Sequence, residues 1–211
     1  MPDNSRRLLL TCRSVISAIG IALTAVLTAT PNVASAHSFV VTLDATVASE
    51  PLNLASAIQG MRVAASERDS HAAETSDGHL GGIDLFIRVQ PVDAAEGIIW
   101  LKGAPTTAAT VIVDFSGPDV APSRIADDGT LVMSPGTLPS AEIWTGNALS
   151  TTNSFAARYQ AAYDSAPDRQ AAQGYNAALR IDRAIRDSGD VHDIAALQEA
   201  LGRSTGGIDW P

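Results

Sequence analysis

Apolar runs of strand length alternate with segments of helical spacing along this chain, and this alternation limits the folds that it can adopt. Phe39–Leu43 is a short, nearly continuous run with β-branched residues, which is typical of a buried parallel strand. After a loop, Leu54, Ile58, Met61 and Ala65 recur at helical spacing and predict a helix that ends near residue 69. The pattern therefore begins with a strand followed by a helix.

Three further strands are predicted, with short helices between them. Ile83–Val89 alternates apolar and polar residues, as a strand with one polar side does. Val111–Phe115 and Leu131–Met133 are shorter and more continuously apolar. The intervening segments Ala94–Leu101 and Ser123–Asp128 are interpreted as brief helices, the second of them closed by a glycine.

The remainder of the chain has a helical pattern. Phe155 and Tyr159 share one face of a predicted helix, and a long helix follows with Pro167 at its first position and Gly189 at its end. A shorter helix is predicted over Asp193–Leu201. Strands alternating with helices and followed by helices predict an α/β fold, with a mostly parallel sheet of about four or five strands flanked by helices on both faces.

The first 36 residues have the features of an export signal. Arg6, Arg7 and Arg13 precede a moderately apolar stretch, and Ala34–Ala36 has the small-x-small pattern that signal peptidases cut after. Ser5–Leu10 also resembles a twin-arginine signal, so both export routes stay open. We expect cleavage after Ala36, a periplasmic location, and one domain over residues 37–211.

Charge and cysteine content exclude several classes of function. The formal net charge is −9, and removal of the arginine-rich signal leaves a more acidic domain, which is unsuited to binding nucleic acid. Cys12, the single cysteine, lies in the part that would be removed, so no disulfide or thiol chemistry is expected. The chain has neither a Gly-x-Ser-x-Gly elbow nor a Gly-rich phosphate loop, and we expect no catalytic role and no cofactor.

Several stretches carry a family resemblance through their order along the chain. The first is Ala57–Ala64. The second consists of three pieces in sequence: Phe115–Gly117, Ser123–Gly129, and the strand Leu131–Met133 with its following turn Ser134–Thr137. Together with the later stretches, they resemble the solute-binding proteins of branched-chain amino acid ABC transporters.

The later stretches lie in the helical part of the chain. They are Phe155-x-x-x-Tyr159, Pro167, Ala171–Ala177 and the closing Gly206–Asp209. Only a short segment separates Thr137 from Phe155, where the family carries a whole second lobe. The resemblance therefore implies a single Rossmann-like lobe without its partner lobe.

The resemblance also implies a ligand site at the carboxyl ends of the strands. Hydroxyls and backbone N–H groups there would hold the carboxylate of an amino acid. The positions that match are Ser116, Ser134, Gly136, Thr137, Ser49 and Glu50.

The implied function is weak binding of a small amino acid or carboxylate as a periplasmic component of an ABC system. The expected partners are the transporter's membrane subunits, or a second copy of the chain that pairs through the exposed inter-lobe face. One alternative is an accessory protein that kept the lobe, lost ligand binding and acts through protein contacts. Another is a metal-binding protein, because His71, Glu74, Asp77 and His79 are clustered in one polar loop.

Overall fold

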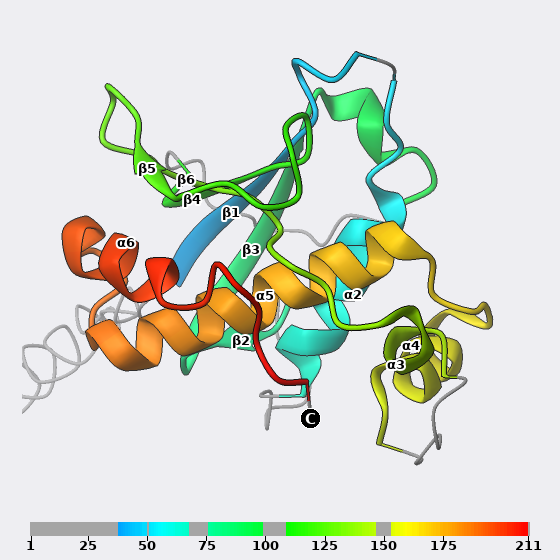
Figure 1. The fold of residues 1–211 in the computed structure, drawn as a ribbon. Helices are drawn as coiled ribbons and strands as arrows, with labels where there is room; N and C mark the ends of the chain where they lie inside the picture. The colour runs from blue at the N-terminus through cyan, green and yellow to red at the C-terminus, as the bar shows by residue number, and fades with distance from the viewer. Residues whose placement is uncertain (1–37, 50, 68–75, 99–108, 147–152, 211) are drawn as a thin grey trace, which may run out of the picture. The chain divides into compact units, whose positions relative to one another are not determined.

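The computed structural model describes the following residues (Figure 1): 38–49, 51–67, 76–98, 109–146 and 153–210. They belong to one compact unit, His37–Pro211. The predicted export signal lies outside the described residues. None of the described helices is both long and apolar enough to cross a bilayer.

The sheet has six strands in the order β2-β3-β1-β4-β6-β5. Its four parallel strands are β1 (Ser38–Asp44), β3 (Ile83–Gln90), β4 (Val111–Asp114) and β6 (Leu131–Met133). Short antiparallel strands lie at the two edges: β2 (His79–Leu80) and β5 (Arg124–Ile125). The predicted α/β fold, a single Rossmann-like lobe with a mostly parallel sheet, is confirmed, with six strands in place of four or five.

Both edge strands correct the interpretation of the sequence. Ser123–Asp128 was expected to be a helix, but Arg124–Ile125 pairs antiparallel with β6. The segment before β3 was expected to be a loop, but His79–Leu80 forms a hairpin with β3 through Gly81 and Gly82, which both have positive φ. A two-residue strand is too short for its side-chain pattern to distinguish it from a turn.

The helices agree more closely with the predictions. α2 spans Ala55–Ser66 and the long α5 spans Arg169–Ser188. The shorter helices are η1 (a 3-10 helix, Val92–Ala95), α3 (Ala141–Trp144), α4 (Phe155–Tyr163) and α6 (Ile194–Gly202). The helix expected at Ala94–Leu101 is thus a 3-10 turn that starts earlier, and Leu101 lies outside the described residues.

The long helix begins two residues later than the sequence indicated, at Arg169 in place of Pro167. The side chain of Asp168 caps α5 by accepting a hydrogen bond from the N–H of Ala171 at 2.7 Å, so Pro167 precedes the cap. At the other end Gly189 closes the helix in the left-handed conformation, with φ of 76°.

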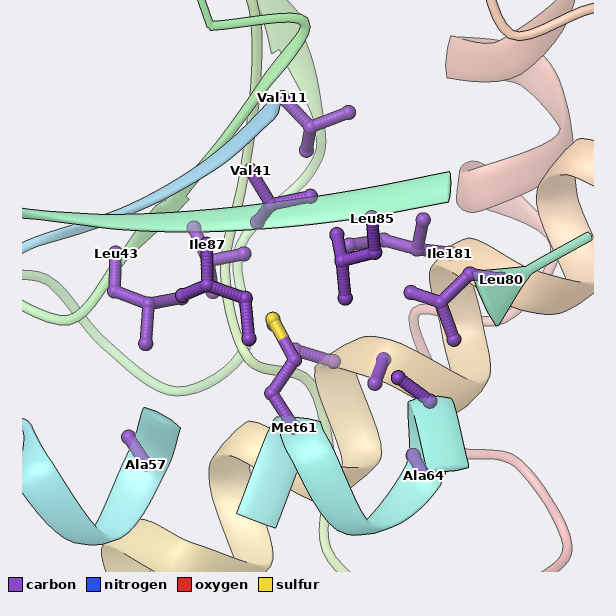
Figure 2. Close-up of a cluster of buried hydrophobic side chains, with 14 of the residues drawn as sticks. Val41, Leu43, Ala57, Met61, Ala64, Leu80, Leu85, Ile87, Val111 and Ile181 are labelled. Carbon is purple, nitrogen blue, oxygen red and sulfur yellow. The ribbon is translucent and has the colours of Figure 1, made fainter. Parts of the chain in front are cut away.

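The core lies between the sheet and the pair α2 and α5. Figure 2 shows Val41, Leu43 and Ile87 of the sheet facing Met61 of α2 and, further along, Ile181 of α5. All five are essentially inaccessible to solvent. Burial of these side chains is the main contribution to the stability of the lobe.

The two core helices are in unusually close contact. A Cβ on Gly60 of α2 would lie 1.9 Å from the carbonyl oxygen of Ala171, and one on Gly174 of α5 would lie 1.9 Å from that of Ala57. The backbones of an early helix and a late helix are therefore in direct contact (Figure 1). This contact determines the position of the late helices relative to the early strands.

Candidate functional site at the carboxyl edge of the sheet

The four parallel strands all end at one edge of the sheet, which we call the carboxyl edge. In the register of the sheet, Asp44 at the end of β1 is paired with Gln90 of β3 on one side and with Asp114 of β4 on the other. The chain passes from β1 to β3 and then crosses to β4, so the strand order reverses beside β1. Open α/β sheets bind ligands at this position, outside the carboxyl ends of the strands.

A hollow opens at this edge between the loop after β1 and the turn after β3. We call it the edge hollow, and its volume is about 280 Å³. Its lining consists of Ala45, Thr46, Ala48, Ser49, Pro51, Leu52, Pro91, Asp93 and Ala94. Six of these nine residues are apolar and mostly small, and the other three have polar side chains.

Of the predicted site residues that the structure describes, Ser49 alone lines the edge hollow. It is exposed, and within the described part of the chain its hydroxyl has no hydrogen-bond partner. Thr46 and Asp93 also line the hollow and were missed by the sequence analysis. Their positions in the sequence could have identified them as candidate site residues, because each lies within three residues of the end of a parallel strand.

Ser134, also predicted to contact ligand, has a structural role in the lobe. Its side chain is buried, and its Oγ accepts from the N–H of Ala121 at 3.0 Å and donates to the carbonyl of the same residue at 3.2 Å. These two bonds fasten the loop after β4 to the end of β6. With both bonds made, the hydroxyl is occupied within the protein.

Gly136 makes room for a side chain that the sequence analysis did not identify. A Cβ at this glycine would lie 2.6 Å from Nη1 of Arg180, and φ of Gly136 is 94°. The glycine was predicted to let the backbone approach a ligand, but its neighbour in the lobe is this guanidinium.

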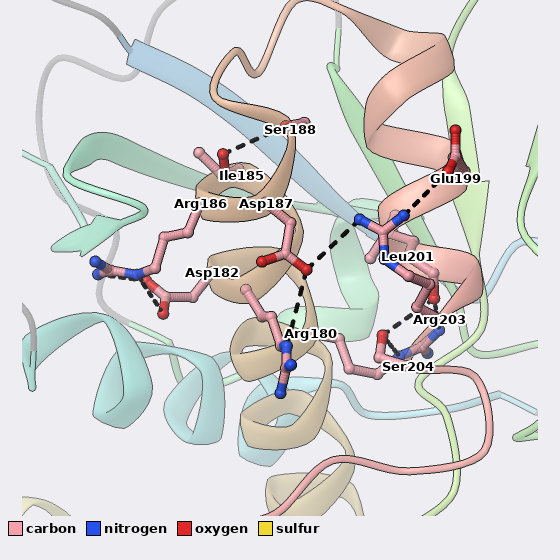
Figure 3. Close-up of polar contacts among 11 residues, drawn as sticks. Arg180, Asp182, Ile185, Arg186, Asp187, Ser188, Glu199, Leu201, Arg203 and Ser204 are labelled. Atoms are coloured by element: carbon pink, nitrogen blue, oxygen red, sulfur yellow. Dashed lines mark hydrogen bonds and ion pairs between the residues drawn. The ribbon is translucent and has the colours of Figure 1, made fainter.

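Arg180 is fully buried on α5, and among the described residues no carboxylate pairs with it. Its Nη1 donates to the carbonyl of Ser134 at 2.7 Å. Its Nε donates to the Oγ of Ser204 at 3.2 Å (Figure 3). Burial lowers the pKa of the Arg180 guanidinium to about 10, because leaving water disfavours the charged form. The arginine ties β6 to the segment after α6.

Thr137 is bonded to the C-terminal segment. It is exposed, and its hydroxyl donates to the carbonyl of Thr205 at 3.3 Å. The buried amide of Asn176 donates to the carbonyl of Thr137 at 3.3 Å and accepts from the indole N–H of Trp210 at 2.9 Å. This turn is thus part of the contact between α5 and the C-terminal segment.

The remaining predicted residues are not gathered around the edge hollow. Ser116 follows β4, and its backbone N–H donates to Asp114 at 2.8 Å, while its Oγ is buried and has no hydrogen-bond partner among the described residues. Glu50 lies outside the described residues. Only Ser49 of the predicted set lines the edge hollow, and Ser134 lines a separate hollow of about 50 Å³ beside β4 and β6.

The two described members of the expected metal cluster are engaged elsewhere. Asp77 accepts from Nε of Arg62 at 2.8 Å, and Nε2 of His79 lies 2.7 Å from a carboxylate oxygen of Asp84. His71 and Glu74 lie outside the described residues. Across the described ranges, no three metal-ligating side chains come together.

Comparisons with protein-family models, with curated proteins and with solved structures each found no match to this chain. The resemblance to solute-binding proteins therefore stays a prediction from the sequence.

Proposed function

We propose that this chain is a non-catalytic, periplasmic solute-binding lobe of a branched-chain amino acid type ABC system, which binds a small amino acid or carboxylate weakly. The observation that carries the proposal is the edge hollow. It lies at the carboxyl ends of parallel strands, and Ser49, a residue chosen from the family resemblance, lines it. The membrane subunits of the transporter are the expected partner.

Weak binding follows from the geometry of a single lobe. A closed small-molecule site buries about 70–90% of its ligand, but the described residues form one lobe, and among them no second lobe closes over the edge hollow. We therefore expect a dissociation constant of about 1 mM, equivalent to about 4 kcal/mol of binding free energy.

Calorimetry with leucine, valine and small carboxylates tests the proposal. We expect millimolar affinity that falls in the Ser49→Ala variant, whereas Thr137→Ala leaves it unchanged because Thr137 faces the C-terminal segment. Micromolar binding by a monomer contradicts the weak single-lobe site, and unchanged affinity in Ser49→Ala contradicts its location.

The second candidate is an accessory protein that acts through protein contacts. Three exposed valines favour it, because Val47, Val92 and Val120 follow three different strands at the carboxyl edge and are 79%, 80% and 48% exposed. A ligand that binds the native state raises the melting temperature. The accessory function predicts no such rise with any small solute, so a thermal shift series separates the two candidates.

A further inference from the structure

We propose that the edge hollow selects primary amines, with Asp93 as the counter-ion of the ligand's ammonium group. This inference rests on the proposed solute-binding function and names the chemical class of ligand. An amino acid would then be held by its ammonium end and side chain, and a carboxylate without an amine would be excluded.

Asp93 provides the negative charge. It lies on η1, which is held by a hydrogen bond from the N–H of Ala94 to the carbonyl of Pro91 at 3.0 Å and by one from Leu54 to the carbonyl of Ala94. Within the described residues its carboxylate makes no hydrogen bond or ion pair, although it lines the hollow. A carboxylate fixed on a short turn beside a hollow can pair with an ammonium without first giving up a protein partner.

The two hydroxyls complement a donor better than an acceptor. The Thr46 hydroxyl donates its hydrogen to the carboxylate of Asp44, so it presents only lone pairs to the hollow. Ser49 can accept as well as donate. An ammonium carries three donors and no acceptor, and it therefore matches a carboxylate with two hydroxyl oxygens.

The charge around the hollow disfavours an anionic ligand. Neither Lys nor Arg occurs in residues 45–54 or 91–98, which contain the two segments that line the hollow, whereas the described residues Asp93 and Glu96 are acidic. No cation in the described lining could pair with a carboxylate. Acidic side chains attract cationic ligands and repel anionic ones, most strongly at low ionic strength.

The apolar lining indicates that the ligand also needs an alkyl group. Ala45, Ala48, Leu52 and Ala94 line the hollow together with two prolines, so contact with a short alkyl body contributes affinity that an ammonium ion alone lacks. The expected ligand is a primary amine that carries a small branched or linear alkyl group.

Three ligands that share one alkyl body test the proposal: 3-methylbutylamine, leucine and 4-methylpentanoate. We expect calorimetry or NMR titration of the purified protein to show the amine binding at least about tenfold more tightly than the carboxylate, which corresponds to about 1.4 kcal/mol. Leucine should fall between them. Asp93→Asn should weaken amine binding at least about fivefold, since the charged partner is lost while the shape is kept.

Asp127→Asn is the matched control. Asp127 is also exposed, lies in the turn between β5 and β6 at the far edge of the sheet, and does not line the hollow. The Asp127→Asn substitution removes the same unit of charge as Asp93→Asn. Unchanged amine affinity in Asp127→Asn would therefore show that the loss of affinity in Asp93→Asn comes from the site and not from net charge. Equal losses in the two variants overturn the assignment of Asp93.

The outcomes separate this inference from the proposed function. If 4-methylpentanoate binds as tightly as the amine or more tightly, amine selection is wrong while solute binding survives. If none of the three ligands binds up to tens of millimolar, both the inference and the proposed function fail. A tighter amine whose affinity is lost in Asp93→Asn but kept in Asp127→Asn supports both.

Discussion

Gly136 and Arg180 show how one residue position depends on another that is remote in sequence. The glycine combines a positive φ of 94° with a guanidinium nitrogen 2.6 Å from the position of its missing Cβ. We predict that Gly136→Ala lowers the free energy of unfolding by about 2–4 kcal/mol, because conformational strain adds to displacement of a buried cation. Urea unfolding measures the loss.

Gly129→Ala is the control for that substitution. Gly129 has a similar φ of 85°, but no described residue beyond its chain neighbours lies within 4 Å of the position of its Cβ. Gly129→Ala should lower the free energy of unfolding by about 1 kcal/mol, because only the backbone conformation is strained. Equal losses at the two glycines would show that Arg180 does not constrain the turn.

The two tyrosines that bond to Gln59 give a prediction about alkaline stability. Burial raises the pKa of Tyr159 and of Tyr163 above the usual value. The folded state then keeps protons that the unfolded state has lost, so the stabilising contribution is complete below about pH 10 and disappears as the pH rises through the folded-state pKa values.

We therefore predict that the double variant Tyr159→Phe/Tyr163→Phe loses less stability between about pH 9 and 11 than the wild type does. At neutral pH it should be less stable by about 1–2 kcal/mol, because the hydrogen bonds to Gln59 at 2.6 Å and 3.4 Å are gone. Arg180 is present in both proteins, so its opposite pH dependence cancels in the comparison. If the free energy of unfolding falls equally with pH in the double variant and in the wild type, the prediction is contradicted.

At the scale of elements, the contact between α2 and α5 depends on two reciprocal glycines. A Cβ at Gly60 or Gly174 would lie 1.9 Å from a carbonyl oxygen of the other helix, so the helices must separate to admit it. We predict that Gly60→Ala and Gly174→Ala each lower the free energy of unfolding by about 3 kcal/mol or more, although alanine favours a helix. Thermal and urea unfolding should agree on this.

Gly202, at the end of α6, provides the comparison for both. In the part of the chain that the structure describes, nothing lies within 4 Å of its missing Cβ, and its φ is not positive. Gly202→Ala should therefore be neutral or slightly stabilising, by up to about 1 kcal/mol. If all three variants behave alike, helix propensity rather than close approach decides the outcome.

Elements in which the apolar pattern extends over many residues could be predicted from the sequence. Two-residue strands and contacts between polar side chains could not. β1 was predicted from a nearly continuous apolar run that includes Val41, and α5 from residues at helical spacing that include Ile185, because burial imposes both patterns. β5 was mistaken for a helix because two residues carry no period. Arg180 and Asn176 gave no signal of burial, since their partners, Ser134, Ser204, Pro135 and Trp210, come from remote segments.

The same distinction applies to the site. A resemblance could point to the carboxyl edge as a whole, but it could not show that Ser134 is bonded to Ala121 or that Thr137 faces the C-terminal segment. Those outcomes depend on how loops close after different strands, which the spacing along one chain does not determine. Asp93 became a candidate only once the fold had placed it beside Ser49.

For the molecule as a whole, the charge of the carboxyl edge determines how two copies could pair. Val47 and Val92 offer an apolar contact, but Asp93 and Glu96 are exposed beside them, and face-to-face pairing would bring like charges together. We therefore predict a monomer at about 20 mM salt and self-association that strengthens at about 500 mM salt, where screening weakens the repulsion. Analytical ultracentrifugation measures both states.

Two substitutions to aspartate locate that contact. Val92→Asp should abolish association at high salt, whereas Ile125→Asp, on the exposed edge strand β5, should leave it intact because it lies away from the carboxyl edge. A dimer that is tighter at low salt would mean that opposite charges meet across the interface. Since residues 45–54 and 91–98 contain no lysine or arginine, the contact would then have to involve other residues of the lobe.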